Sequence, residues 1–238
     1  LALVGIVSAS TANSELKACE LLCEKVFWET ASQAQIALEI SRVEGNERDL
    51  RGTTPLMYLM YYGRSEHLTE NIAALLDAGI DVNARDLHGN TALMSTSAGQ
   101  YIEPLKLLLA AGADVSFRNG SETTALIRTA KWADAQNLQA LLDAGADVDA
   151  QDEWGITALM LVSSDTSAYR DVEVKLKVLI DAGANVNAQN DDLETALMWA
   201  ASLGTPENLR ALLDAGADVN VRNKYGANAI LNAIRDDT

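Results

Sequence analysis

The sequence predicts an all-α solenoid built from one repeated pair of short helices, and two recurrences carry this prediction. A Thr-Ala-Leu or Thr-Pro-Leu triplet opens five units, at Thr54, Thr91, Thr124, Thr157 and Thr195. A glycine closes each unit, and successive closing glycines are 33, 33, 38 and 33 residues apart. A self-similar period of about 33 residues is typical of stacked helical repeats, in which each unit buries its apolar side against the next.

The elements of one unit can be justified on residues 195–220. Thr195 is expected to cap the first helix, because its hydroxyl accepts from an exposed backbone N–H. Thr205 and Pro206 give the same signal for the second helix, in which one apolar stripe is formed by Leu209, Leu212 and Leu213. Gly216 then occupies the position where a helix end favours a left-handed residue, and a polar turn follows.

The in-phase triplet, leucine pair, glycine and Ala-Asp/Asn-Val turn resemble those of ankyrin-repeat proteins over roughly residues 46–234. The resemblance implies helix-turn-helix pairs joined by β-hairpin-like loops. Where the family has Thr-Pro-Leu-His, this chain has Thr-Ala-Leu-Met in the units that open at Thr91, Thr157 and Thr195. In the other two units, Met57 and Ile127 occupy the position of the family's histidine. Because that histidine normally hydrogen-bonds across neighbouring loops, this departure bears on loop bracing. We interpret the apolar residue as a packing substitute that retains the fold.

The predicted organisation has three parts. Residues 1–12 are predicted to be the remnant of a signal peptide, residues 13–48 an N-terminal helical cap or degenerate half-repeat, and residues 49–238 an array of about five repeats plus a C-terminal half-repeat. In the last segment, a polar outer side is expected from Asn232, Arg235, Asp236 and Asp237. This segment either caps the array or marks its truncation. Cys19 and Cys23, one helical turn apart, either form a disulfide or pack as thiols in the cap.

An exported setting, periplasmic or secreted, is expected from the short apolar stretch 1–12. It ends in small residues, with Ser10 and Ala12 spaced like a signal-peptidase site. Similarity to exported bacterial ankyrin-repeat proteins, in the Phe27-Trp28 start and the Ala-Asp-Val-Asn turns, supports this expectation. The alternative is a buried first helix, which would leave the protein cytoplasmic.

Two units carry extra residues between their helices, four around residues 63–69 and five around residues 163–170. Insertions in solenoids lie in loops, often on a functional rim. Tolerated drift is the equal alternative, because longer loops cost little.

The formal net charge is −16, from 34 acidic and 18 basic residues. This charge disfavours nucleic acid as a partner and favours a basic protein, although solubility alone also accounts for it. No stretch reaches the roughly 18 apolar residues that a membrane span needs.

No catalytic, cofactor or metal site is expected. The two histidines, His67 and His88, lie in different units and fit no ligand or catalytic motif. Acidic pairs such as Asp143 and Asp147 flank helix ends, where they suit turns rather than acid–base chemistry.

The residues expected to contact a partner lie in the turns before each first helix and at the first-helix ends, which the resemblance places on the concave face. Exposed aromatics there are expected to anchor a protein, whereas Trp28 and Trp199 are expected to pack in the core. The predicted partner-binding residues are Arg51, Tyr61, Tyr62, His88, Asn90, Lys131, Trp132, Glu153, Trp154, Asp191, Asp192, Glu194, Lys224 and Tyr225.

The sequence therefore predicts a monomeric, non-enzymatic module that binds another protein through one face of a repeat stack. Two alternatives remain open. The array is a structural spacer or assembly segment of a longer solenoid, or it is an inhibitor or immunity-type protein for a basic toxin or enzyme.

Overall fold

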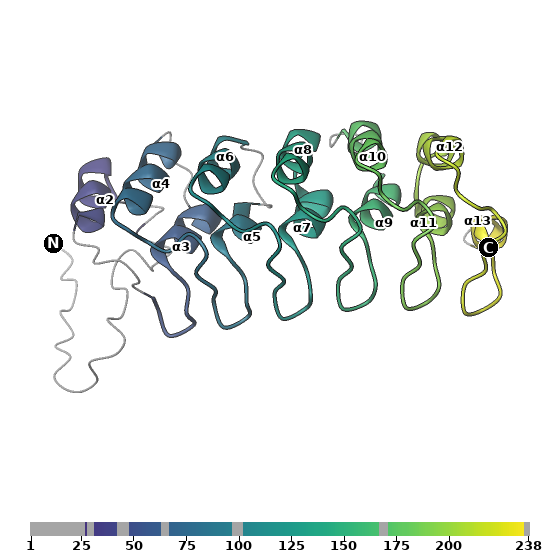
Figure 1. Cartoon of the computed structure of the whole chain (residues 1–238), viewed down its shortest axis with the longest axis horizontal. Helices are drawn as coiled ribbons and strands as arrows, with labels where there is room; N and C mark the ends of the chain where they lie inside the picture. The colour runs from purple at the N-terminus through teal and green to yellow at the C-terminus, as the bar shows by residue number, and fades with distance from the viewer. Residues whose placement is uncertain are drawn as a thin grey trace, which may run out of the picture.

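The computed structural model describes Phe27 and residues 31–41, 48–62, 67–96, 102–166 and 171–235. In this part, short helices form two rows, with loops projecting from the side of one row (Figure 1). The predicted signal remnant, Trp28, both cysteines and parts of the two insertions lie outside the described residues.

The first row holds the first helix of each repeat: α3 (Pro55–Tyr62), α5 (Ala92–Thr96), α7 (Ala125–Trp132), α9 (Ala158–Ser163), α11 (Ala196–Leu203) and α13 (Ala229–Arg235). The second row holds α2 (Gln33–Ile40), α4 (Leu68–Asp77), α6 (Ile102–Ala110), α8 (Ala135–Asp143), α10 (Val172–Asp181) and α12 (Pro206–Asp214). The part of the chain that is described contains no named strand, and none of its helices is long and apolar enough to cross a membrane. The predicted all-α solenoid is confirmed.

Local capping explains where the helices begin and end. The hydroxyls of Thr124, Thr157 and Thr195 each accept from the backbone N–H three residues later, at 3.3–3.4 Å. Thr205 does the same for α12 at 3.2 Å. The closing Gly216 has a φ of 89°, the left-handed conformation predicted for it.

The core is a strip that runs between the two rows and from repeat to repeat. In each repeat the leucine two positions after the opening threonine is at most 2% exposed, as is seen for Leu56, Leu93, Leu126, Leu159 and Leu197. The residue that replaces the family's histidine is at most 3% exposed at Met57, Met94, Ile127, Met160 and Met198. The first helices α3, α5, α7, α9 and α11 each contact their own second helix and the next first helix, so the apolar substitute packs as interpreted.

Buried polar side chains link successive repeats on the second-helix side. The position eight residues before the closing glycine is buried throughout. It is polar at Asn71, Asn137, Lys175 and Asn208, and it is proline at Pro104. Lys175 Nζ donates to the Ala130 carbonyl at 2.9 Å, and Asn208 Nδ2 donates to the Ser163 carbonyl at 3.1 Å. Both acceptors lie near the C-terminal end of a first helix in the preceding repeat, where carbonyls lack intrahelical partners. These two bonds hold α10 and α12 against the repeat that precedes each of them.

The C-terminal helix α13 exposes apolar side chains that were not predicted. Asp236 and Asp237, two of the residues expected on its polar outer side, lie outside the described residues, and the described helix exposes Ile230, Leu231 and Ile234 by 60%, 45% and 61%. Ile230 and Leu231 stand at the leucine and methionine positions of the earlier first helices, which are buried there. The difference arises because no second helix or following repeat covers α13 in the described chain.

The buried Lys175 gives a stability test. Lys175→Ala should lower the free energy of unfolding by about 3 kcal/mol, because it leaves the Ala130 carbonyl without its donor and opens a cavity. Lys175→Asn should cost only about 1 kcal/mol, since an asparagine makes the equivalent bond at position 208. Urea denaturation followed by circular dichroism measures both; equal losses would show that the hydrogen bond contributes nothing.

Candidate functional site

Six loops project from the first-helix side, and each begins at an aspartate or asparagine that we call its anchor. In chain order, loops one to six have the anchors Asp49, Asp86, Asn119, Asp152, Asn190 and Asn223. In every loop the anchor's Oδ1 accepts from the backbone N–H groups two and four residues later, at 2.8–3.0 Å. The anchor thereby closes the loop on itself, as Asp and Asn side chains do in turns.

Backbone hydrogen bonds then join the tip of each loop to the tip of the loop before it. The N–H one residue after the anchor donates to the carbonyl two residues after the preceding anchor. The five bonds are 2.7–3.1 Å long, from Leu87 to Arg51, Gly120 to His88, Glu153 to Ser121, Asp191 to Trp154 and Lys224 to Asp192. The tips therefore form one continuous ladder along the array.

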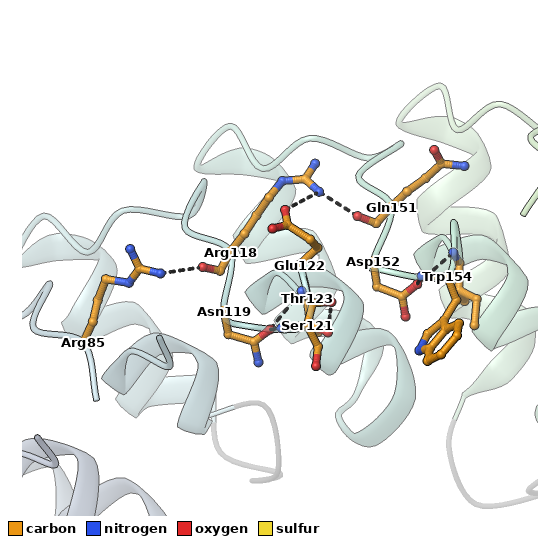
Figure 2. Close-up of polar contacts among 10 residues, drawn as sticks. Arg85, Arg118, Asn119, Ser121, Glu122, Thr123, Gln151, Asp152 and Trp154 are labelled. Atoms are coloured by element: carbon orange, nitrogen blue, oxygen red, sulfur yellow. Dashed lines mark hydrogen bonds and ion pairs between the residues drawn. The ribbon is translucent and has the colours of Figure 1, made fainter. Parts of the chain in front are cut away.

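A second ladder is formed by the side chain just before each anchor. Arg85 donates to the Arg118 carbonyl at 2.9 Å, and Arg118 donates to the Gln151 carbonyl at 2.6 Å (Figure 2). Arg48 and Gln151 make the equivalent bonds to the loops that follow them, at 3.2 and 3.0 Å. Loop bracing is thus supplied by these side chains, although the residue at the histidine position is apolar.

Two loops contain a side chain where the others have glycine. The residue three positions after the anchor has a φ of 73–78° in Gly52, Gly89, Gly155 and Gly226, but it is Glu122 (55°) in loop three and Leu193 (59°) in loop five. The left-handed conformation costs such a residue about 1–2 kcal/mol. At Gly155 space also matters, because a Cβ there would lie 2.9 Å from Asn190 Cα.

Several residues near the loops are held by interactions within the chain. The Tyr58 hydroxyl donates to Asp49 at 3.1 Å, and burial together with this bond raises the pKa of Tyr58. The Trp199 indole donates to Glu194 at 2.9 Å. Trp199 is half-buried against the core, as expected, but its polar edge reaches the base of loop five.

Nothing among the described residues indicates catalytic chemistry. They contain no group of three metal-ligating side chains. His67 is hydrogen-bonded to Glu70 at 2.7 Å on the second-helix side, and His88 is exposed at a loop tip. A hollow of about 350 Å³ lies between α10 and α12, beside the second insertion, and its lining includes Asp165, Asp171, Glu173, Glu207 and Asn208.

Comparison with protein-family models agrees with this geometry. The model described as "Ankyrin repeats (3 copies)" matches residues 7–119 and 126–223. The chain belongs to the ankyrin-repeat family. A search of curated proteins found no match. Ankyrin repeats are generally protein–protein interaction modules and generally non-catalytic.

The structure places the predicted partner-binding residues of this ankyrin array in three settings. Eight lie at the tips of adjacent loops and are brought together by the ladder: Arg51, His88, Glu153, Trp154, Asp191, Asp192, Lys224 and Tyr225. Asn90 and Glu194 lie on the returning side of their loops, where they are hydrogen-bonded to Asn119 and Trp199. Tyr61, Tyr62, Lys131 and Trp132 lie at the C-terminal ends of α3 and α7. Because α3 and α7 each begin next to a loop and have eight residues, these four lie about 12 Å from the loop bases.

Exposure separates the aromatic residues further. Trp154 and Tyr225 at loop tips are 62% and 70% exposed, and Trp132 is 49% exposed. Tyr62 is half-buried, with its ring centroid 5.8 Å from that of Tyr58 and 6.1 Å from that of Tyr61. Tyr62 therefore packs within a tyrosine cluster, whereas the two tryptophans are open to solvent.

Two large exposed residues were missed by a selection based on aromatics and charges. Leu50 and Leu87 are 90% and 76% exposed, and both directly follow an anchor. The signal that identifies them is their position in the loop, because side chains at a tip have no neighbour to pack against. An apolar residue at that position is as informative as an aromatic one.

The anchor of loop four provides a direct test of how Trp154 is positioned. Asp152→Ala should lower the free energy of unfolding by about 2 kcal/mol, because the Trp154 and Ile156 N–H groups lose their acceptor. Asp152→Asn should cost under about 0.5 kcal/mol, because asparagine anchors three other loops with the same two bonds. Urea denaturation compares them; an asparagine variant as unstable as the alanine variant would mean that the charge matters rather than the acceptor.

Proposed function

We propose that this ankyrin-repeat chain binds a protein partner through its loop-tip surface, which comprises the two residues after each anchor. These are Leu50, Arg51, Leu87, His88, Gly120, Ser121, Glu153, Trp154, Asp191, Asp192, Lys224 and Tyr225. The observation that carries the proposal is the exposure of four large apolar side chains on this surface, between 62% and 90% for Leu50, Leu87, Trp154 and Tyr225.

Two properties of the surface favour binding. Tryptophan and tyrosine are enriched among the residues that dominate interface energies. The anchors and ladders also fix the backbone beneath these side chains before any partner arrives. Association then orders only side chains, and this preorganisation leaves more of the contact energy as affinity.

The charge of the chain supports a basic partner. The formal net charge of −16 gives a field that accelerates encounter with a positively charged protein. Such an attraction is screened within about 8 Å at physiological ionic strength, so the association rate should fall as salt is added. An inhibitor or immunity role against a basic toxin or enzyme is one special case of this proposal.

Assembly through the C-terminal end is a second candidate, favoured by α13. Its exposed Ile230, Leu231 and Ile234 make an apolar end at positions that earlier repeats bury, which suits packing against a further helix pair. In this case, the array would be an assembly segment of a longer solenoid, with a further helix pair packed on α13.

Affinity capture with three matched variants distinguishes these functions. One variant carries Trp154→Ala and Tyr225→Ala on the loop tips. The second carries Val174→Ala and Leu213→Ala, which remove exposed apolar side chains from second helices. The third carries Ile230→Lys on the end of α13. The extracts come from both the exported and the cytoplasmic fractions, because an exported setting is also a proposal.

We expect the loop-tip variant to retain at least ten-fold less partner than the unmodified chain, while the second-helix variant retains the same amount. Thermal unfolding of each variant verifies that it is folded. Loss of the partner only in the α13 variant would favour assembly, and loss only in the second-helix variant would contradict the loop-tip proposal.

A further inference from the structure

The surroundings of Trp154 differ from those of the exposed Trp132 and Tyr225, and from those of the exposed Tyr61, whose ring lies 6.1 Å from that of Tyr62. Lys131 Nζ lies 5.1 Å from the centroid of the Trp132 ring, and Lys224 Nζ lies 5.1 Å from that of the Tyr225 ring. Over Trp154, the described part of the chain places no such cation. The indole extends away from Arg118 in Figure 2. Trp154 thus offers an aromatic face that the chain's own cations leave open.

The charged residues beside Trp154 are acidic. Glu153 precedes it in the chain, and the Asp191 N–H donates to the Trp154 carbonyl at 3.0 Å, which brings the tip of loop five against it. Both carboxylates are exposed and make no ion pair with any described residue. Neighbouring acidic residues are already paired, since Asp192 binds Lys224 and Glu122 lies 3.7 Å from Arg118.

At the neighbouring pair of loops, Asp192 shows how a carboxylate and an aromatic ring at the tips bind a cation together. Its carboxylate accepts from the Lys224 ammonium, and this hydrogen bond raises the pKa of Lys224. The same ammonium also lies over the Tyr225 ring. Loops five and six therefore combine a carboxylate, a cation and an aromatic ring. Loops four and five hold the carboxylates and the ring without the cation.

We propose that Trp154, Glu153 and Asp191 form a recognition site for an arginine side chain of the protein partner. A guanidinium group is planar and weakly hydrated, so it stacks on an indole face while its N–H groups donate to carboxylates. This inference rests on the proposed function, because it assumes that the partner meets the loop-tip surface. It adds that the group recognised on the partner is a guanidinium, and that it binds at the tips of loops four and five.

The backbone of loops four and five is built for this proximity. Gly155 lets loop five approach closely, because any Cβ at that position would clash with Asn190 Cα and the Asp191 nitrogen, at 2.9 and 3.0 Å. The Asp152 carboxylate fixes the Trp154 N–H at 2.9 Å. The indole and the two carboxylates are therefore attached to a backbone that is set before an arginine arrives.

Nuclear magnetic resonance of the four tryptophan indole N–H groups tests the site. The probe is the peptide acetyl-Gly-Arg-Gly-Arg-Gly-amide, and its control replaces both arginines with the uncharged isostere citrulline. The Trp154→Ala variant assigns the Trp154 signal. At 0.15 M salt, we expect the arginine peptide to shift this signal saturably and the citrulline peptide to bind at least ten-fold more weakly.

Two double variants that remove the same charge distinguish binding at this site from attraction by the net negative charge of the chain. Glu153→Gln with Asp191→Asn should weaken the arginine peptide at least five-fold. Glu207→Gln with Asp214→Asn removes the same charge from exposed positions on α12 and should change the affinity less than two-fold. Equal losses in the two pairs, equal shifts from the two peptides, or an unmoved Trp154 signal would overturn the proposal.

Partner capture keeps this failure distinct from failure of the proposed function. If Leu87→Ala abolishes capture of the partner but Trp154→Ala does not, the loop-tip proposal is supported and the arginine site is contradicted. A partner retained by both variants would remove the loop-tip proposal itself. Loss with Trp154→Ala and with the Glu153 and Asp191 pair supports both.

Discussion

Hydrogen bonds between successive loops are the interaction on which the exposed surface depends. A loop that carries Trp or Leu at its tip cannot hold it by packing, because the tip has no core beneath it. Its backbone must then be fixed by polar contacts. Each loop here has an anchor oxygen and a tip-to-tip amide bond, and loops one to four also have a side chain that reaches the next loop. The backbone of this exposed surface is therefore held by polar contacts instead of by packing.

Side chains link neighbouring repeats on both sides of the array, but the linking residues are buried on one side and exposed on the other. On the second-helix side, Lys175 and Asn208 are buried and donate to carbonyls at the end of a first helix in the preceding repeat. On the loop side, exposed Arg85 and Arg118 donate to backbone carbonyls of the following loop. Every one of these acceptors is a main-chain group, so the link tolerates a change of side chain in the neighbour. Loop tips can therefore vary from repeat to repeat while the spacing stays constant.

The sequence predicts the fold well because its signals are local: Thr195 caps its helix and Gly216 ends one through contacts within the same unit. The second ladder was not predicted, because the acceptor of Arg118 is a backbone carbonyl in the next repeat, and no sequence motif marks such a contact. The exposure of Ile230 and Leu231 on α13 was not predicted, because both residues fit the buried pattern, and that pattern does not show whether a neighbouring repeat is present. Trp154 was predicted as a partner-binding residue from the sequence, but only the structure shows that no described cation lies over its ring.

Hydrogen exchange at the loop tips tests the central claim most directly. The amides of Glu153, Asp191 and Lys224 donate to the preceding loop in the structure. If the tips form a fixed ladder, these amides should exchange at least about 100-fold more slowly than in an unstructured chain, because exchange then requires local opening. Exchange at the unstructured rate would show that the loops move independently, and a preorganised binding surface would then not exist.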